Sequence, residues 1–558
     1  MEILDYATLL FCLVGQSVFG FYKSRKKDEE QPSAHATMVG SGVSVWSVTL
    51  SVCSGFISSI SLLGFPAEIY FQGGMMLWFV PMYCIAFPIV AYVFLPVLYN
   101  LKLTTIYEYF ERRFNFSCRI VTTTLFCVQM ILYNSVALYA PSLAIATITK
   151  IPIILSIFIT STLSAIYISI GGAKAGIYTS ALQMMLIFLA LSFIITISLK
   201  ETSIGQVYSD IVDGNRLILD DFRLNPTIRH SVWTLVIGGT GNILSLFAAN
   251  QLSIQRYMAM DSLKKAQRVV LLNIICNTLI LFCYVSVGFL IYSHYKNCHP
   301  KLANNNELLP QFVMDVISPY PGSVGLFAAA VYSAGISTLS GSFTAVSSIV
   351  INDVLKIYRQ HKKQAPLTQD QVEYAMRMLP ILLAFCSVFI AFLCSQMQSI
   401  ILQVSFIVFG AGGGPVLGSF IVGLFIPNIK GKAALTGLIL SILTCLSISI
   451  GSVILKVKPI ILELVGHCGN ETGVIYDNNN NNMKSYYDPS FIGQVTSMPL
   501  DYNLDRIFAI SYQYYSVIAV LSNIAVSYIT QKFIDVFTTK NNDDKKVELE
   551  LISPLLRA

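Results

Sequence analysis

The chain has 558 residues, of which 54% are hydrophobic and only 12% are charged. Soluble globular domains carry about 25% charged residues, so this composition excludes an ordinary soluble protein and indicates an integral membrane protein. The formal net charge of +6 follows from the membrane topology described below and does not favour a nucleic-acid partner.

Apolar stretches long enough to cross a bilayer recur along the whole chain. A helix needs about twenty apolar residues to cross the hydrocarbon core, and about thirteen stretches meet this requirement. We therefore expect an all-α membrane protein with about thirteen transmembrane helices. The predicted spans are residues 3–22, 44–70, 75–99, 119–147, 151–170, 175–198, 231–255, 269–292, 323–352, 376–396, 399–426, 434–454 and 506–530.

The charges around the spans predict the membrane topology. Glu2 and Asp5 lie at the start of the first span and a positive cluster (23–27) follows it, so this span is not a cleavable signal peptide. The later loops rich in Lys and Arg all fall on one side, which the positive-inside rule identifies as the cytoplasm: 102–119, 256–268, 356–363 and 430–432. We expect an extracellular N-terminus, a cytoplasmic C-terminus and a multi-pass protein of the plasma membrane.

The predicted outer loops carry two features of extracellular segments. Asn470-Glu471-Thr472 is a glycosylation sequon in the loop between the last two spans, so Asn470 is a predicted glycosylation site. Cys468 lies in the same loop and Cys298 lies in another outer loop. Two such cysteines can form a disulfide in an oxidising compartment, although the sequence alone leaves their pairing open.

Serine and threonine side chains form a polar stripe on two of the predicted spans. Spacing by threes and fours places each stripe on a single face of its helix. The stripe of the second span consists of Ser44, Ser47, Ser51, Ser54, Ser58 and Ser61, and that of the ninth span consists of Ser333, Ser337, Ser340, Thr344 and Ser347. Small polar residues at this spacing also mediate close helix packing without binding any ligand, and this alternative stays open.

Two of the spans contain residues that interrupt a helix. Gly64 and Pro66 predict a break in the second span, and the glycines and amides between 238 and 251 predict another in the seventh. Backbone carbonyls at a break, together with hydroxyls on a neighbouring helix, are the hard oxygen ligands that a sodium ion prefers. Interrupted helices five spans apart are typical of secondary transporters built from two inverted repeats.

The sequence contains few residues suited to other kinds of chemistry. No Asp, Glu, Lys or Arg lies at the middle of a predicted span, and Glu68, Lys174 and Asp353 lie near span ends. A buried carboxylate relay for protons is therefore disfavoured. The chain has no nucleotide-binding loop, no zinc-binding cluster and no Ser-His-Asp set, so we expect no enzymatic activity.

Eight motifs between Ser44 and Pro427 are specific when they are taken together. They are GFPAEIY (64–70), TTIYEYFERRF (104–114), ILYNSVALYAPSLA (131–144), GGAKAGIYTSALQ (171–183), WTLVIGG (233–239), NQLSIQRY (250–257), YSAGISTLS (332–340) and GAGGGPVLGSF (410–420). Through these motifs the chain resembles the sodium/solute symporter family, and specifically its branch of sodium-coupled monocarboxylate, multivitamin and iodide transporters.

The resemblance implies a fold and a domain organisation. The fold is a LeuT-like core of two inverted five-helix repeats, with an extra helix before the core and two after it. The implied parts are an N-terminal helix (1–22), a first repeat (44–200), a second repeat (230–427), two C-terminal helices with the glycosylated outer loop (433–532) and a cytoplasmic tail (533–558).

The resemblance also implies two sites. The principal sodium site would consist of the carbonyls of Ser54, Ile57 and Ala334 and the hydroxyls of Ser337 and Thr338. The substrate cavity would be lined by Ser61, Tyr139, Phe247, Val416 and Phe420. Sodium would be the only metal and the only cofactor.

Two positions depart from the family pattern. Ser61 stands where the iodide transporter has a glutamine, which favours an organic solute over a halide. Tyr178-Thr179-Ser180 stands where the family has Trp-Thr-Asp, while Gln183 is retained. Ser180 and Gln183 therefore mark a possible, degenerate second ion site, and the resemblance leaves the number of coupled sodium ions open.

The expected function is sodium-coupled symport of a small organic solute by alternating access. The favoured solute is a monocarboxylate or a carboxylate-bearing vitamin, and membrane lipid, sodium and the solute are the expected partners. Two alternatives stay open. The first is a non-transporting solute sensor or a sodium-leak channel on the same scaffold, and the second is a symporter of iodide or another anion.

Overall fold

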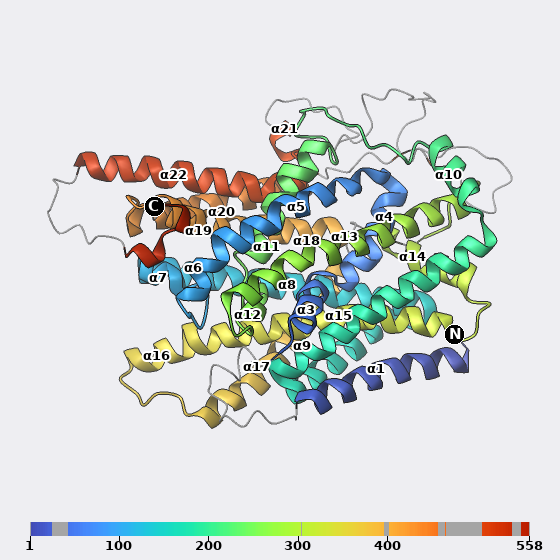
Figure 1. Ribbon diagram of the computed structural model, residues 1–558, viewed down its shortest axis with the longest axis horizontal. Helices are drawn as coiled ribbons and strands as arrows, with labels where there is room; N and C mark the ends of the chain where they lie inside the picture. The colour runs from blue at the N-terminus through green and yellow to red at the C-terminus, as the bar shows by residue number, and fades with distance from the viewer. Residues whose placement is uncertain are drawn as a thin grey trace.

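The computed structural model describes residues 2–24, 43–302, 304–395, 401–455, 462, 464, 505–537 and 548–556. Every regular element in these residues is a helix, which confirms the predicted all-α class (Figure 1). The two chain termini lie toward opposite ends of the long axis of the molecule, along which most of the long helices run (Figure 1).

The helices fall into three groups along the chain. The first group is α1 (Ile3–Ser24), α3 (Val45–Phe56), α4 (Ser59–Gln72), η1 (Gly74–Trp78), α5 (Phe79–Ile89), η2 (Val90–Phe94), α6 (Leu95–Asn100), α7 (Glu108–Arg113), α8 (Phe116–Thr149), α9 (Ile153–Glu201) and α10 (Ile204–Asp213). The second group is η3 (Thr234–Gly238), α11 (Gly239–Phe247), α12 (Gln251–Tyr257), α13 (Leu263–His294), η4 (Asn305–Glu307), α14 (Leu308–Phe312), η5 (Val313–Ile317), α15 (Ser323–Ile349), η6 (Val350–Leu355), α16 (Lys356–His361), α17 (Gln369–Ser395), α18 (Ile401–Val408), η7 (Phe409–Gly413) and α19 (Gly414–Phe425). The last group is α20 (Gly431–Ile454), α21 (Asp505–Phe508), η9 (Tyr512–Tyr514), α22 (Tyr515–Phe537), η10 (Leu549–Leu551) and η11 (Pro554–Leu556).

The membrane-spanning segments match the prediction from hydrophobicity. Among the described residues, nine helical stretches are long and apolar enough to cross a membrane. Two more spans are bent pairs, α3 with α4 at 61° and η3–α11 with α12 at 62°. Two shorter apolar helices cover Ile3–Phe19 and Ile153–Ser164. Every predicted span therefore has a helical counterpart.

Two predicted spans, 151–170 and 175–198, lie within the single helical element α9. This element has 49 residues. A straight helix of that length would measure about 74 Å, more than twice the thickness of the hydrocarbon core. The contacts of α9 with α15 show that it does not run straight.

The second half of α9 runs antiparallel to α15. Ser180 contacts Ser337, and Gly176 lies against Ser340. Residue numbers therefore fall along α9 in the direction in which they rise along α15.

The first half of α9 lies on the opposite side of this contact. Thr160 donates a hydrogen bond to Tyr332, which precedes Ser337 on α15. A straight continuation of α9 would place Thr160 about 24 Å beyond Gly176, away from Tyr332. The chain therefore reverses within α9, and this element supplies two spans as the sequence predicts.

The first interrupted helix breaks between α3 and α4, where Ile57 and Ser58 leave the helical conformation. The prediction that Gly64 and Pro66 form the break is wrong, because both residues lie inside α4. Pro66 removes one backbone hydrogen bond but does not end the helix, since every residue of α4 is buried against neighbouring elements. Gly64 instead permits close packing, because a methyl group added there would lie 2.7 Å from the Leu402 side chain.

The second interrupted helix breaks between α11 and α12, as predicted. Asn250 precedes α12, and its side-chain oxygen accepts a hydrogen bond from the Leu252 amide at 2.9 Å. The glycines of this span serve a different purpose, which is close packing of η3 and α11 against α5 and the C-terminal helices. A methyl group at Gly238 would lie 2.7 Å from the Gln513 carbonyl oxygen.

Two buried ion pairs connect the helices near the ends of the bundle. Arg229 Nε donates to Glu68 Oε1 of α4 at 2.5 Å, and both side chains are at most 1% exposed. Arg119 of α8 pairs with Asp353 of η6, whose carboxylate also accepts a hydrogen bond from Thr105 at 2.9 Å. Of the charged residues near predicted span ends, Glu68 and Asp353 are therefore neutralised by partners from other elements, and the side chain of Lys174 lies outside the described residues.

The Glu68–Arg229 pair provides a test of this packing. Glu68→Gln leaves the buried guanidinium without a counter-charge, so we expect the free energy of unfolding to fall by about 3–5 kcal/mol. Thermal unfolding of the purified protein in detergent measures the effect. The control is Glu108→Gln, because Glu108 forms a partly exposed pair with Arg112 and its loss costs about 1 kcal/mol or less. Equal losses in the two variants would contradict the assignment.

Candidate functional site

The end of α3 meets the middle of α15 at a cluster of buried hydroxyl groups. Ser54 Oγ lies 2.6 Å from Ser337 Oγ, and Ser337 Oγ donates to Ser180 Oγ of α9 at 3.1 Å. The Ser337 hydroxyl also lies 3.4 Å from the carbonyl oxygen of Ser54. All three side chains are at most 1% exposed. The two polar stripes therefore come together beside the first helix break.

The other residues implied for the sodium site lie within one helical turn of this contact along their own elements. Thr338 follows Ser337 on α15, and its hydroxyl donates to the Ala334 carbonyl at 3.1 Å. Ile57 directly follows the last residue of α3. The last carbonyls of a helix have no amide partner within that helix, so they are available to a ligand. The role of these residues in binding an ion stays a prediction.

The oxygen atoms gathered here suit a monovalent cation. Carbonyl and hydroxyl oxygens bind hard cations, whereas calcium sites generally include carboxylates. Within the described part of the chain, no group of three or more His, Cys, Asp or Glu residues could hold a metal ion. Each serine hydroxyl has one proton and two acceptor lone pairs, so a cation can bind the oxygen through a lone pair while the hydroxyl keeps its proton.

The predicted degenerate second ion site lies next to the same cluster. Ser180 bonds to Ser337, as described above, and Gln183 lies almost one turn further along α9. Gln183 is fully buried, and neither atom of its amide group has a hydrogen-bond partner. An unpartnered buried amide costs free energy, so the Gln183 side chain has donors and an acceptor that the chain itself does not satisfy.

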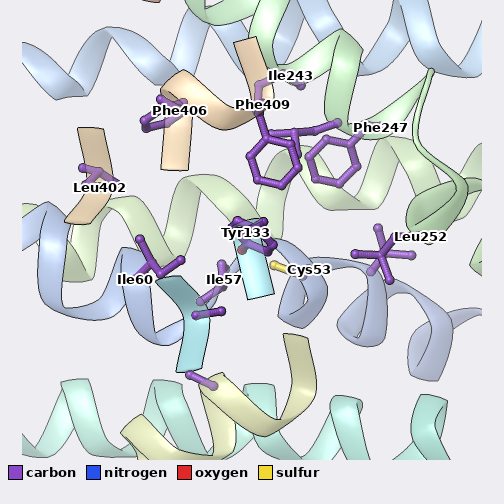
Figure 2. Close-up of a cluster of buried hydrophobic side chains, with 14 of the residues drawn as sticks. Cys53, Ile57, Ile60, Tyr133, Ile243, Phe247, Leu252, Leu402, Phe406 and Phe409 are labelled. Atoms are coloured by element: carbon purple, nitrogen blue, oxygen red, sulfur yellow. The ribbon is translucent and has the colours of Figure 1, made fainter. Parts of the chain in front are cut away.

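A small cavity lies beside the two helix breaks, on the side of α3 and α12. It is bordered by the end of α3, the ends of α11 and α12, and aromatic side chains from α8 and η7. Figure 2 shows the rings of Phe247, Phe409 and Tyr133, and the ring centroids of Tyr133 and Phe409 lie 4.5 Å apart. The Tyr133 hydroxyl interacts with the side chain of Ser58 at the first break. The cavity therefore combines an aromatic wall with polar atoms at its end.

Of the five residues implied for the substrate cavity, Phe247 lines this one. Its ring lies 5.4 Å from that of Phe56 and 4.9 Å from that of Phe87. Ser61 lies in the first turn of α4, where its hydroxyl donates to the Ser58 carbonyl at 2.8 Å and lies 3.4 Å from the Tyr284 hydroxyl.

The other three implied residues lie away from the lining of this cavity. Tyr139 accepts a hydrogen bond from Asn304 at 3.5 Å. Phe420 packs on Tyr109 and Phe110 with ring centroids 5.3 and 4.4 Å apart, and Val416 is buried one turn before it on α19. Contact of these residues with a solute stays a prediction.

Arg256 is a cavity residue that the sequence pattern does not reveal. The positive-inside pattern assigns it to the loop 256–268, but the structure places it in α12 with 7% of its surface exposed. Tyr133 and Phe409 are likewise absent from the expected cavity residues. The sequence feature that could have identified Arg256 is its position six residues after Asn250. This position makes it part of the half-helix that follows the second break.

The features expected in the outer loops are described in part. Cys298 is disulfide-bonded. Cys468 and Asn470 lie outside the described residues. The Cys298–Cys468 pairing and the glycosylation of Asn470 therefore stay predictions.

Known proteins share both sequence and fold with this chain. The model of the sodium:solute symporter family matches residues 38–441. Sodium-coupled monocarboxylate transporter 1 of Mus musculus is 31% identical over 541 residues, which cover 94% of this chain and 86% of that protein. The putative sodium-dependent multivitamin transporter of Drosophila melanogaster is 29% identical over 467 residues, which cover 82% of this chain and 76% of that protein.

The fold is also that of a solved structure. The substrate-bound, outward-open state of a sodium-coupled sialic acid symporter superposes with a TM-score of 0.76 at 21% sequence identity, over 95% of this chain and 98% of that one. This likeness confirms the LeuT-like fold class that the two interrupted helices indicate.

Proposed function

Because the chain belongs to the sodium:solute symporter family, we propose that it carries a small monocarboxylate across the plasma membrane together with sodium, by alternating access. Membership of this family makes the chain a sodium-coupled transporter of a small organic solute and not an enzyme. The choice of a monocarboxylate is supported by relatives that are named for such solutes and align with 94% of the chain.

The observation that carries the proposal is the contact between Ser54 and Ser337. It joins the first interrupted helix to α15, which belongs to the other predicted repeat. A cation bound to both segments stabilises the arrangement of the break in which these oxygens converge. A solute that binds beside the break in this arrangement then binds more tightly when sodium is present, which is the thermodynamic basis of coupling.

The orientation of the chain in the membrane supports a path for the solute toward the cytoplasm. We propose that the N-terminus is extracellular and the C-terminus cytoplasmic, because α7, α12 and α16, which lie in or beside the positive segments, are found toward the end of the molecule that holds the C-terminus (Figure 1). The cavity between α3 and α12 then lies on the cytoplasmic side of the breaks. On the outer side, α4 packs directly on α18 through Gly64 and Leu402.

Uptake by the reconstituted protein tests the proposed function. Proteoliposomes are supplied with labelled butyrate, pantothenate or iodide, in sodium or in choline. We expect butyrate to accumulate in sodium and not in choline, because the inward sodium gradient supplies the driving force. Iodide uptake without butyrate uptake would assign the protein to anion symport. A sodium current without accumulation of any of these solutes would favour the channel or sensor alternative.

The Ser337 hydroxyl provides a test of the sodium site. Ser337→Ala removes one oxygen from the cluster, so we expect the sodium concentration for half-maximal uptake to rise by about fivefold, with surface expression little changed. The matched control is Ser347→Ala, because Ser347 is equally buried on α15, lies about 15 Å further along the helix, and its hydroxyl has no partner. Identical sodium activation in wild type and Ser337→Ala would refute the assignment.

A further inference from the structure

Arg256 places a positive charge beside both interrupted helices. It lies in α12, and its Nη1 donates a hydrogen bond to the carbonyl oxygen of Ser51 in α3. Gly55 of α3 and Gly341 of α15 make room for it, because a methyl group added at either position would overlap the guanidinium. The charged group therefore lies between α3 and α15, the two helices that meet at the hydroxyl cluster.

The charge of Arg256 has no acidic partner in the described part of the chain. Two other buried arginines are neutralised, Arg119 by Asp353 and Arg229 by Glu68. Arg256 is only 7% exposed, and its hydrogen bond in the described part of the chain goes to a backbone carbonyl and not to a carboxylate. An uncompensated charge in the membrane interior is costly and typically marks a functional site.

The hydrogen-bonding capacity of Arg256 is also largely unused. A guanidinium has five N–H donors. Arg113, which is buried to the same extent, donates to the backbone carbonyls of Gly423, Ile426, Pro427 and Ile429. Among the described residues, Arg256 donates only to Ser51. The remaining donors are therefore available to a ligand.

Arg256 lines two cavities. The first is the cavity at the helix breaks, which it shares with Phe56, Tyr133 and Asn250. The second is bordered by Ser340 and Thr344, which follow Ser337 on α15 in the direction of α16. In the proposed orientation, Arg256 lies between the break and the cytoplasm.

We propose that Arg256 is a carboxylate-binding site on the inner side of the helix breaks, where the carboxylate of the solute binds as it leaves toward the cytoplasm. This inference rests on the proposed function and names a residue of the solute path. A guanidinium forms two parallel hydrogen bonds with a carboxylate, which satisfies donors and charge at once. A neutral solute would leave both unsatisfied.

Binding of the carboxylate from the inner side tests the proposal. Full-length protein in proteoliposomes is loaded with labelled butyrate, and sodium-dependent efflux is measured against internal butyrate concentration. We expect Arg256→Gln to raise the internal butyrate concentration for half-maximal efflux by about tenfold or more, because a charged hydrogen-bonded pair is lost. Arg256→Lys keeps the charge without the paired geometry, so we expect a rise of about threefold.

The matched control is Arg268→Gln, because Arg268 is an exposed arginine on the same predicted side and lines neither cavity. We expect the internal butyrate concentration for half-maximal efflux by Arg268→Gln to equal that of wild type. The sodium concentration that half-activates uptake from outside is expected to stay within about twofold of wild type in all three variants, since Arg256 lies outside the hydroxyl cluster. A general loss of structure would also change the sodium concentration that half-activates uptake.

The outcomes separate this inference from the proposed function. Failure of the wild type to transport butyrate in sodium would overturn the proposed function. If the wild type transports butyrate and Arg256→Gln has the wild-type internal butyrate concentration for half-maximal efflux, the site alone is overturned. If Arg256→Gln does not reconstitute, a wild-type value of this concentration in Arg256→Lys overturns the site. Replacement of chloride by methanesulfonate distinguishes chloride from the solute carboxylate as the anion bound by Arg256. If transport depends on chloride, Arg256→Gln abolishes this dependence, and the butyrate half-saturation is unchanged, the site binds chloride and the proposal is overturned.

Discussion

The contact between Ser54 and Ser337 is the interaction on which the proposed coupling depends. It brings the end of a broken helix against the hydroxyl face of a helix from the other predicted repeat, and both serines are fully buried. Carbonyls at the end of α3 need a partner there, because an unsatisfied backbone group in the membrane interior is costly. The hydroxyls satisfy part of this requirement and a cation can satisfy more of it. Ion binding and the arrangement of the break are therefore linked through the same atoms.

The distribution of charge in the bundle is consistent with this account. The hydroxyl cluster contains no formal charge, and the buried acids Glu68 and Asp353 are paired with arginines from other elements. Arg256 is different: no described carboxylate pairs with it, and unlike Arg113, which donates to four backbone carbonyls, it donates to one and faces two cavities near the breaks. A sodium ion travelling with a carboxylate adds no net charge to the pathway, and the carboxylate supplies the anion that Arg256 lacks. The neutral ion site and the unpaired arginine therefore favour the same class of solute.

Much of this architecture could be predicted from the sequence, because span length and the three-and-four spacing of serines are local properties. The site of the first break could not. Gly64 and Pro66 are the strongest local interrupters, but packing keeps their helix intact, and the chain leaves the helix at Ser58, where the sequence shows only adjacent serines. Arg256 has the sequence neighbours of a positive loop, and only the half-helix after the second break buries it. Tyr133 has no distinguishing signal, because an aromatic residue in a bundle usually packs.

The most direct test of the central claim is an experimental density map of the protein in sodium, compared with one in choline. The account predicts a compact density feature in the sodium map alone, in contact with the Ser54 carbonyl and the Ser337 hydroxyl, with the two serine hydroxyls moved apart to admit it. Maps that are identical at this position, or an ion bound away from the break between α3 and α4, would contradict the account.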